Sequence, residues 1–493
     1  MSTVVIIGAG VGGLATAARL AVKGHSVTVI EQSDRVGGKL HTYRKDGYAF
    51  DTGPSLFTLP AVYRDLFLKT GKSLEDSVDL QAVEPAFTYH FADGSELVLP
   101  GVDPAKCADS IAQCMGEQAG SEWREFMHRA GEMWRLTRQP FLQSPLNGFA
   151  SLLPLANPKD VATIAPFTTL RKLATKTFSD PRLVTLVDRY ATYTGSDPRK
   201  APAVLATVPY VEQLFGAWHI GGGLGNLAVA LEERCRERGV TFRLSTTVSR
   251  IETTGNHVTG VTTEEGEFLS ADIVVSNADA RLTYGELLAQ SPTKKPKVPG
   301  DPSLAGFVIL LGLQGRTEGI THHNVWFAPD YNAEFDAIFG KNPHPVTDPT
   351  IYVCSPDDPL MRPHDDSESW FILINAPRHD PSGRAGVNWE DSQLAERYAN
   401  SIIDSLAARG TDIRDRIDLM EVYTPADLER DTRAPGGSIY GTSSNGVNAA
   451  FNRPANKSPI DGLFLVGGSS HPGGGLPLVG MGAEITAELI GRA

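Results

Sequence analysis

The chain has 493 residues, 41% of them hydrophobic, which predicts two or three packed cores because a single ordinary domain is shorter. Its formal net charge is −13 and it contains no basic run. Nucleic acid is therefore not expected as a partner, since phosphate binding requires clustered Lys and Arg. The four cysteines are scattered without C-x-x-C spacing, so we expect reduced thiols and neither a disulfide framework nor a zinc site.

No targeting segment is evident in the sequence. The apolar residues 4–7 are too few for the core of a signal peptide, and no basic residue precedes them. An uncharged run of about eighteen apolar residues does not occur, so a membrane-spanning helix is not expected. These features predict a cytoplasmic location.

The first elements of the chain predict a dinucleotide-binding unit. Residues 4–7 form a short, mostly β-branched run, which is typical of a buried parallel strand. Glycines follow at G-x-G-x-x-G spacing, which permits a tight turn, close approach of a pyrophosphate and packing of the next helix. The alanine-rich residues 14–22 predict that helix, with its N-terminus aimed at the phosphates. The candidate cofactor contacts in this turn are Gly8, Gly10, Gly12 and Gly13.

A second strand is predicted over residues 25–30, and Glu31 ends it. An acidic side chain about twenty residues beyond the glycines can accept hydrogen bonds from a ribose 2′-OH, which favours FAD or NAD over a 2′-phosphorylated cofactor. The alternative is a glycine-rich turn in an ordinary α/β unit. The register of strand, turn, helix, strand and carboxylate disfavours that alternative.

Two further turns follow this unit, Gly37-Gly38-Lys39 and Asp51-Thr52-Gly53-Pro54. The motifs GAGVGGL, E-x5-GGK and YAFDTGPS resemble the N-terminal signature of the flavin amine oxidase and carotenoid desaturase superfamily, and within it that of the bacterial phytoene desaturase group. The resemblance implies FAD as the cofactor. It adds as candidate contacts Gly38, Lys39, Gly53 and Pro54. Lys39 departs from the arginine that relatives often carry, which keeps the charge but loses the bidentate geometry.

The middle of the chain predicts a second unit. Residues 60–71 predict an amphipathic helix, residues 87–99 a hairpin that turns at Asp93-Gly94, and residues 103–136 a long helical stretch. Farther on, residues 307–313, 351–354 and 370–375 predict strands of a mixed sheet over the flavin ring, with a helix over residues 392–408.

Residues 139–178 have an unusual composition. They are rich in Pro, Leu, Phe and Ala, and against one acid, Asp160, they carry the bases Lys159, Arg171, Lys172 and Lys176. Apolar residues with basic neighbours are typical of a segment that lies in an anionic lipid surface. A helical cap packed on the protein is the alternative. A substrate dissolved in the membrane favours the first interpretation.

After the glycine-rich residues 216–225, the sequence predicts a helix over 226–238 and strands over 241–244 and 271–276. In the family that the chain resembles, this part returns to the cofactor domain, and the resemblance implies that the backbone of Val248 holds the adenine. Lone histidines are more often hydrogen-bonded structural residues than proton carriers, so His219 is given no role in proton transfer. The adjacent His322 and His323 lack a further ligand at i+4, so no metal is predicted.

The end of the chain predicts a second cofactor turn. Residues 462–466 predict a strand, followed by Gly467-Gly468, the motif HPGGGLP and a helix from about residue 478. Such a turn offers N–H donors to another polar part of one large cofactor, such as a flavin edge where negative charge develops. The stretch resembles the C-terminal flavin-contact motif of the phytoene desaturase group, which implies contacts at Gly468, Gly475, Leu478 and Val479.

These elements predict an α/β fold with a Rossmann-type FAD-binding domain, a mixed-sheet substrate domain and a helical cap that associates with the membrane. The parallel sheet of the first domain is discontinuous in sequence. We assign the FAD-binding domain to residues 1–85, 226–290 and 455–493, the substrate domain to 86–135 and 291–454, and the cap to 136–225.

No Ser/His/Asp, Cys/His or metal constellation is supported by spacing, so the catalytic side chains stay unassigned. The resemblance implies an FAD-dependent desaturase that acts on a long acyclic carotenoid at a membrane surface, by hydride transfer in a dry, apolar site. Three alternatives stay open: a desaturase or oxygenase of a hydroxy- or methoxy-carotenoid, an amine or porphyrinogen oxidase, and a flavin- or lipid-binding module without turnover. The intact phosphate glycines and Glu31 disfavour the last.

Overall fold

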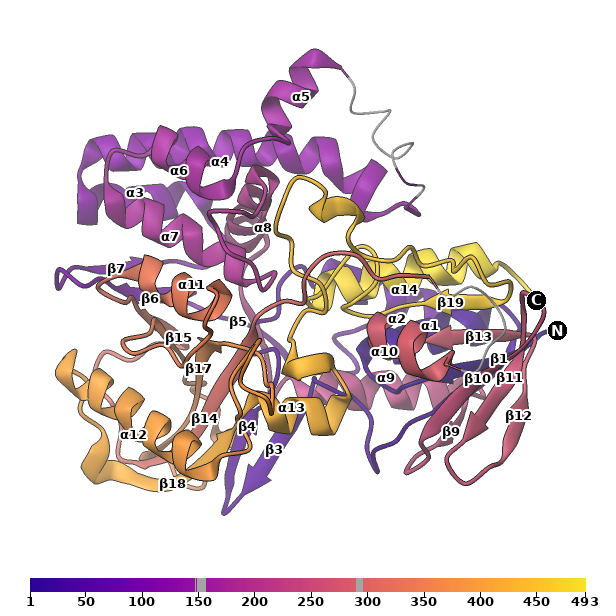
Figure 1. The fold of residues 1–493 in the computed structure, drawn as a ribbon. Coiled ribbons are helices and arrows are strands. Elements are labelled where there is room, and N and C mark those ends of the chain that lie inside the picture. Colours follow the sequence, from indigo (N-terminus) through magenta and orange to yellow (C-terminus); the bar gives the residue numbers. More distant parts are fainter. Residues whose placement is uncertain (147, 149–156, 290–295) are drawn as a thin grey trace.

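The computed structural model describes residues 1–146, 148, 157–289 and 296–493. A five-stranded sheet in the order β19-β13-β1-β2-β9 forms one side of the molecule, near both termini (Figure 1). All its neighbouring strands are parallel, so their carboxyl ends meet at one edge. The strands are β1 (Thr3–Ile7), β2 (Ser26–Ile30), β9 (Thr241–Arg243), β13 (Ile273–Ser276) and β19 (Leu463–Leu465). The predicted α/β fold with a discontinuous parallel sheet is confirmed.

The two faces of this sheet are covered by different layers. Val4 and Ile6 of β1 pack on one face with residues of four helices: α1 (Val11–Val22), α2 (Ala61–Thr70), α9 (Gly225–Glu237) and α14 (Leu476–Ile490). Val5 and Ile7 pack on the other face with a three-stranded antiparallel sheet: β10 (Val248–Thr254), β11 (His257–Thr263) and β12 (Phe268–Ser270). Successive side chains of this fully buried strand point to opposite faces of the sheet and therefore belong to two different cores.

A seven-stranded mixed sheet in the order β18-β14-β17-β16-β15-β6-β7 forms the other half. Only β6 and β15 pair in parallel; the other pairs are antiparallel. Its strands are β6 (Phe87–His90), β7 (Glu96–Leu99), β14 (Ala305–Gln314), β15 (His323–Trp326), β16 (Ile351–Cys354), β17 (Ser367–Ala376) and β18 (Ile417–Tyr423). Helix α12 (Ser392–Ala408) packs on one face, and the hairpin β3 (Thr42–Lys45) and β4 (Tyr48–Asp51) on the other.

A group of helices lies above this sheet in Figure 1. It contains α3 (Pro104–Met115), α4 (Glu117–Thr137), a π-helix (Arg138–Leu142), α5 (Pro158–Ile164), α6 (Leu170–Thr177), α7 (Pro181–Thr192) and α8 (Thr207–Phe215). The predicted helical stretch over 103–136 is confirmed, and Gly116, with φ 99°, divides it into α3 and α4.

The predicted domain boundary between residues 135 and 136 falls inside α4. Buried residues of α3 and α4 share one core with those of α6 and α7, and half-buried residues of α8 pack against it. We therefore propose that the helical cap extends from α3 to α8. The other domain boundaries stay predictions, and the boundary at residue 290 falls outside the described residues.

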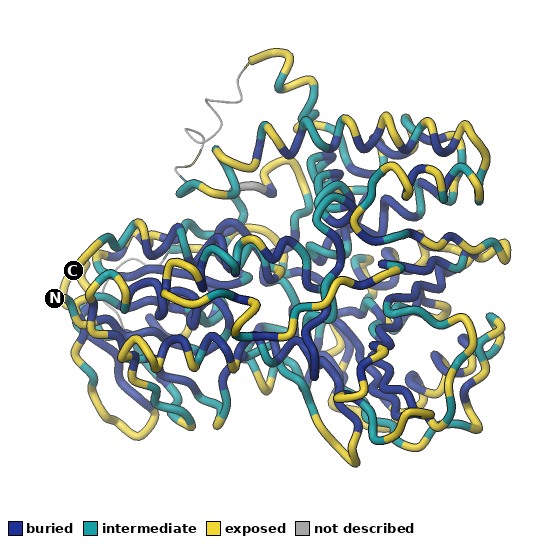
Figure 2. The backbone as a smooth tube through the Cα atoms, turned by 180° about the vertical axis from the view of Figure 1, so that it is seen from behind, coloured by how far each residue is buried: buried dark blue, intermediate teal, exposed yellow. Residues whose placement is uncertain are grey.

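The four cysteines form no disulfide in the structure, and their reduced state stays a prediction. Within the described ranges, no helix combines the length and apolar character needed to cross a bilayer. Figure 2 shows that the parallel sheet is buried, whereas α5 projects from the cap and carries exposed and half-buried residues. Part of the predicted interfacial segment, residues 149–156, lies outside the described residues.

Candidate active site

The two glycine turns, from opposite ends of the sequence, are in direct contact. A Cβ atom on Gly12 would lie 3.1 Å from the Cα of Gly467. Asn277, which follows β13, fills the space beside them: Cβ atoms on Gly10 and Gly12 would lie 2.7 and 2.5 Å from its side-chain amide. Since the carboxyl ends of β1, β13 and β19 share one edge, the turns that follow them form a single floor made mainly of backbone.

Helices α1 and α14 both begin at this floor. Their N-cap residues are Gly10 and Gly475, and neither helix has a side-chain cap. The first N–H groups of both helices are therefore free of side-chain acceptors and can donate to a ligand. Gly13 plays a different part: a Cβ there would lie 2.2 Å from the carbonyl oxygen of Gly8, so it permits close packing of α1 on the first turn.

Glu31, at the end of β2, is 8% exposed. Its carboxylate accepts hydrogen bonds from the N–H of Ala9 at 2.6 Å and of Ser33 at 3.0 Å. These two donors orient the carboxylate, and each oxygen keeps a further lone pair for a hydroxyl donor. The geometry fits the role predicted for Glu31 toward a ribose.

The second glycine pair lies against the first turn. Gly37 donates its N–H to the carbonyl oxygen of Ala9 at 2.9 Å. Lys39 points toward the C-terminal half of the chain, where its Nζ donates to the carbonyl oxygens of Ser438 at 2.9 Å and Ile439 at 2.8 Å. Burial lowers the pKa of Lys39 to about 8. The lysine thus holds two distant segments together.

A cavity of ≈740 Å³ begins at these turns. Of the predicted cofactor contacts, only Gly13 lies outside its lining, in keeping with its packing role. The lining contains Gly8, Gly10, Gly12, Glu31, Gly38, Lys39, Gly53, Pro54, Val248, Gly468, Gly475, Leu478 and Val479. The cavity continues past them between the cap and the mixed sheet. There its wall is mostly apolar and includes Leu59, Trp134, Phe141, Leu205, Val208, Val308, Phe371 and Leu373.

Two residues of this site were missed in the sequence. Arg453 donates from its guanidinium to the carbonyl oxygens of Gly468 at 2.5 Å and Thr442 at 2.6 Å, and burial lowers its pKa to about 10. Asn277 is the second. Its position in the sequence could have identified it, because it directly follows a predicted parallel strand, and ligand contacts are common at the carboxyl ends of such strands. Arg453 lies in an irregular segment, and no feature of the sequence predicted its role.

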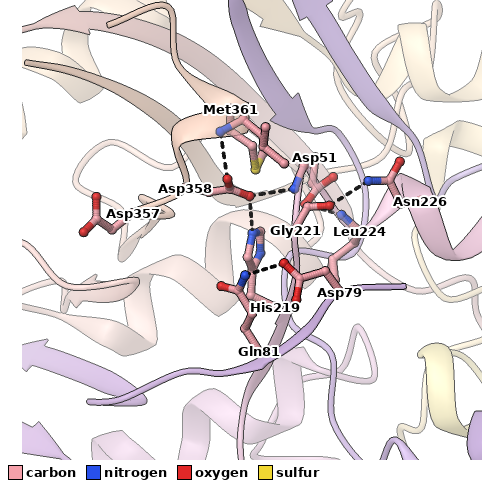
Figure 3. A network of polar contacts seen from close by, with 12 residues as sticks. Asp51, Asp79, Gln81, His219, Gly221, Leu224, Asn226, Asp357, Asp358 and Met361 are labelled. Carbon is pink, nitrogen blue, oxygen red and sulfur yellow. Dashed lines mark hydrogen bonds and ion pairs between the residues drawn. The ribbon is translucent and has the colours of Figure 1, made fainter. Parts of the chain in front are cut away.

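A polar network outside the cavity lining holds the glycine-rich turn that leads into α9 (Figure 3). His219 on β8 (Trp218–Ile220), which pairs with β5 (Leu80–Ala82), is 5% exposed. Its Nε2 lies 2.9 Å from a carboxylate oxygen of Asp358, which also accepts the N–H of Gly222 at 2.6 Å. Asp51 accepts the N–H of Leu224 at 2.9 Å. These bonds fix the turn and give His219 a structural role.

His322, His323 and Cys354 bring their ligand atoms within 4.8 Å of one another. The prediction of no metal considered only the two histidines; pairing of β15 with β16 sets Cys354 opposite His323 and adds the third group. Nδ1 of His323 is hydrogen-bonded to the hydroxyl of Tyr352 at 2.8 Å. Burial raises the pKa of the Cys354 thiol, which disfavours the thiolate that metal binding requires. Absence of a metal stays a prediction.

The parallel sheet, the paired glycine turns and the acidic end of β2 define a dinucleotide-dependent oxidoreductase. The chain belongs to the flavin containing amine oxidoreductase family, whose sequence pattern matches residues 11–301. Its cofactor is FAD, and the residues present fit it: two uncapped helix starts, a backbone floor and an oriented carboxylate. The predicted resemblance is confirmed.

Curated relatives align over nearly the whole chain. The 4,4'-diapolycopene oxygenase of Methylomonas sp is 34% identical over 99% of this chain and 97% of its own length. The 1-hydroxycarotenoid 3,4-desaturase of Flavobacterium sp. (strain P99-3) is 34% identical over 99% of both. The 4,4'-diaponeurosporene oxygenase of Staphylococcus aureus is 29% identical over 99% of this chain and 97% of its own.

Solved structures share the fold. Putrescine oxidase with bound putrescine superposes with a TM-score of 0.65 at 16% identity, covering 99% of both chains. An oxidoreductase from Methanosarcina mazei superposes with a TM-score of 0.62 at 18% identity, covering 99% of this chain and all of its own. At this identity the likeness is one of fold alone.

Proposed function

We propose that the protein is an FAD-dependent oxidoreductase that desaturates a long acyclic carotenoid or, with molecular oxygen as co-substrate, oxygenates it. The observation that carries this proposal is the single cavity that joins the backbone floor of the glycine turns to an apolar passage between cap and sheet. The names of the aligned relatives support the carotenoid class and favour an already desaturated substrate over phytoene. Phytoene desaturation, expected from the motifs, is retained as one arm of the test.

The chain's own contribution is to orient the polyene and exclude water. Apolar side chains such as Trp134, Val208 and Leu373 give a long hydrocarbon a dry wall and no competing hydrogen-bond partner. The chemistry that bound FAD supplies is acceptance of a hydride from a C–H bond, and loss of a proton from the neighbouring carbon leaves a double bond. An allylic, cation-like transition state requires little help from a strong base, which agrees with the unassigned catalytic side chains.

An amine oxidase is the weaker alternative. A substrate ammonium group would enter a cavity whose wall already contains the buried guanidinium of Arg189. Like charges at close range in a low-dielectric site repel each other strongly. The rings of Tyr193 and Tyr352, which could form a cage for a cation, already contact that guanidinium. A binding module without turnover is disfavoured by the oriented Glu31 and the uncapped helix starts.

We also propose that the protein is cytoplasmic and binds a membrane surface peripherally through the cap. Phe167 is 83% exposed, and its neighbours Ile164 and Pro166 line the cavity, so an apolar surface adjoins the passage. Lys159, Lys172 and Lys176 are exposed nearby, whereas Arg171 is paired with Asp188. An exposed apolar side chain with exposed lysines near it in sequence suits an anionic bilayer.

The test uses purified protein with FAD and liposomes that contain phytoene, a fully conjugated acyclic carotene or its hydroxylated analogue. Chromatography with mass detection measures loss of two hydrogens or gain of oxygen, and anaerobic bleaching of the flavin near about 450 nm reports hydride acceptance. We expect conversion of at least one conjugated carotenoid. Conversion of no carotenoid in any arm would contradict the proposal. A colourless protein that cannot be reconstituted would favour the binding module.

A further inference from the structure

Arg189, on α7, is a buried cation inside the apolar part of the cavity. The residue is 7% exposed and belongs to the cavity lining. Its guanidinium carbon lies 5.0 to 5.7 Å from the centres of four aromatic rings, those of Phe87, Tyr89, Tyr193 and Tyr352. Ring faces attract the charge but accept no strong hydrogen bonds. The aromatic side chains thus hold the guanidinium in place and leave most of its N–H groups unpaired.

The hydrogen bonds around Arg189 are few. One of its terminal nitrogens donates to the hydroxyl of Tyr193, which donates to a carboxylate oxygen of Glu212 at 3.1 Å. Tyr190 donates to the other oxygen of Glu212 at 2.6 Å. The nearest carboxylate is therefore reached only through a tyrosine. In the described part of the chain, Arg189 forms no salt bridge, and its remaining guanidinium nitrogens meet no protein acceptor.

The remaining N–H donors of Arg189 can be reached only from the cavity side. A buried charge is normally paired with an opposite charge or fully hydrogen-bonded, because both charge and donors have lost water. Arginine carries five N–H donors in a rigid plane. In Arg189, only one terminal nitrogen of the guanidinium donates, to the hydroxyl of Tyr193. An apolar hydrocarbon in the cavity would leave the others unpaired. An oxygen atom on the substrate would satisfy them.

The position of this cation is also informative. The hydroxyl of Tyr352, whose ring contacts Arg189, is hydrogen-bonded to the hydroxyl of Ser55 at 2.9 Å. Ser55 directly follows Gly53 and Pro54, the loop that lines the cofactor end of the cavity. The guanidinium is therefore separated by only two side chains from the loop predicted to contact FAD. A group bound by Arg189 would therefore lie on the side of the apolar passage that faces this loop.

We propose that Arg189, with Tyr193, forms a subsite for an oxygen atom at one end of the polyene, so that the substrate is a carotenoid with a terminal hydroxyl or carbonyl group. This inference rests on the proposed function and makes its substrate class more specific. The guanidinium donates to the end-group oxygen, and the apolar wall holds the chain behind it. A hydrocarbon end loses this bond and leaves the donors unpaired, so the subsite discriminates between the two kinds of end.

The test compares acyclic polyenes of one length that carry a hydrocarbon end, a terminal alcohol or a terminal aldehyde. Dissociation constants are measured on the holoenzyme by quenching of flavin fluorescence, and turnover is measured in parallel. We expect at least one oxygenated ligand to bind about tenfold or more tighter than the hydrocarbon. Arg189→Met should bring this ratio close to one, because the oxygenated ligands lose a donor and the hydrocarbon no longer leaves donors unpaired. Arg189→Lys, which keeps the charge, should retain part of the preference.

Arg409→Met is the matched control, because Arg409 is also largely buried and bonded to the carbonyl oxygen of Trp326 but lies outside the cavity lining. It should keep the wild-type ratio. A wild-type ratio near one, or an unchanged ratio in Arg189→Met, would overturn the subsite. If Arg189→Met does not fold, the ratio of dissociation constants in the wild type and in Arg189→Lys tests the subsite instead.

The two proposals fail in distinguishable ways. Equal binding and turnover of hydrocarbon and oxygenated polyenes would overturn the subsite and leave the proposed function intact. Failure to bind or convert any polyene would overturn both. Preference for the alcohol or for the aldehyde identifies which oxygen-containing end group Arg189 binds.

Discussion

The two ends of the cavity are built on different principles. At the cofactor end the wall is mainly backbone, and Gly10, Gly12 and Gly467 bring the turns after β1 and β19 against Asn277, which follows β13, where an added Cβ would clash. At the substrate end the wall consists of side chains from the cap, the mixed sheet and the C-terminal segment. A backbone wall tolerates almost no change, whereas a side-chain wall can be altered one residue at a time. The difference allows one cofactor end to serve many substrates.

The largest effect is expected from adding a methyl group at the cofactor end. Gly13→Ala would place a Cβ 2.2 Å from the carbonyl oxygen of Gly8, so α1 must move away from the first turn. Overpacking of this kind costs about 1–3 kcal/mol of stability. We expect loss of bound FAD on purification and a lower Tm, measured by absorbance and thermal unfolding. Gly285→Ala, at an exposed helical glycine with open space around it, is the control. An FAD content equal to wild type in Gly13→Ala would contradict the backbone-wall interpretation.

The substrate end should respond in the opposite way, with FAD retained and substrate binding lost. Val208, on α8, lines the apolar passage, and Val208→Asp would place a carboxylate where a hydrocarbon must pass. We expect turnover of the preferred polyene to fall by about tenfold or more, because each buried charge must be desolvated. Val229→Asp is the matched control, because it introduces the same charge at a residue that is 48% exposed on α9. Loss of FAD together with turnover would show that the two ends are not independent.

The same contrast explains what the sequence could predict. The cofactor end is encoded in short motifs, because each glycine requirement is local, and candidate contacts from 8 to 54 and from 468 to 479 could be predicted one by one. Helix 392–408 and the 87–99 hairpin were also predictable from periodicity and turn residues. The substrate end is assembled from residues far apart in sequence. No local sequence pattern marks Arg189 as a site residue. Its surroundings are set by Phe87 and Tyr352, which contact it from two strands of the mixed sheet.

A smaller, pH-dependent effect is expected at the substrate end. Glu334, on α11 (Tyr331–Phe339), is fully buried and accepts hydrogen bonds from the Thr350 N–H and the Asn375 amide, both at 2.9 Å. Burial raises the pKa of Glu334 to about 7, above its ordinary 4.5. The folded state therefore binds more protons than the unfolded state between these values, and stability falls as pH rises through this window.

Removing the titrating group should remove that slope. We expect the free energy of unfolding of Glu334→Gln, measured by denaturant titration, to change less from pH 5 to pH 8 than that of wild type, by on the order of 2 kcal/mol. The glutamine also loses one acceptor, but that cost does not depend on pH. Parallel curves for the two proteins would mean that Glu334 is ionised in the folded state.

The smallest effect is expected at the surface that adjoins the passage. Phe167 is 83% exposed beside residues that line the cavity, and burial of a phenylalanine in a lipid interface contributes about 2 kcal/mol at most. Phe167→Ser should therefore weaken binding to anionic liposomes several-fold in a flotation assay, and slow turnover of liposomal substrate to a similar degree. Phe268→Ser is the control, because Phe268 is 53% exposed on β12, in the cofactor half. Turnover in detergent should not change in either variant, since the substrate then reaches the passage without a bilayer. Equal effects of both substitutions would place the membrane contact elsewhere.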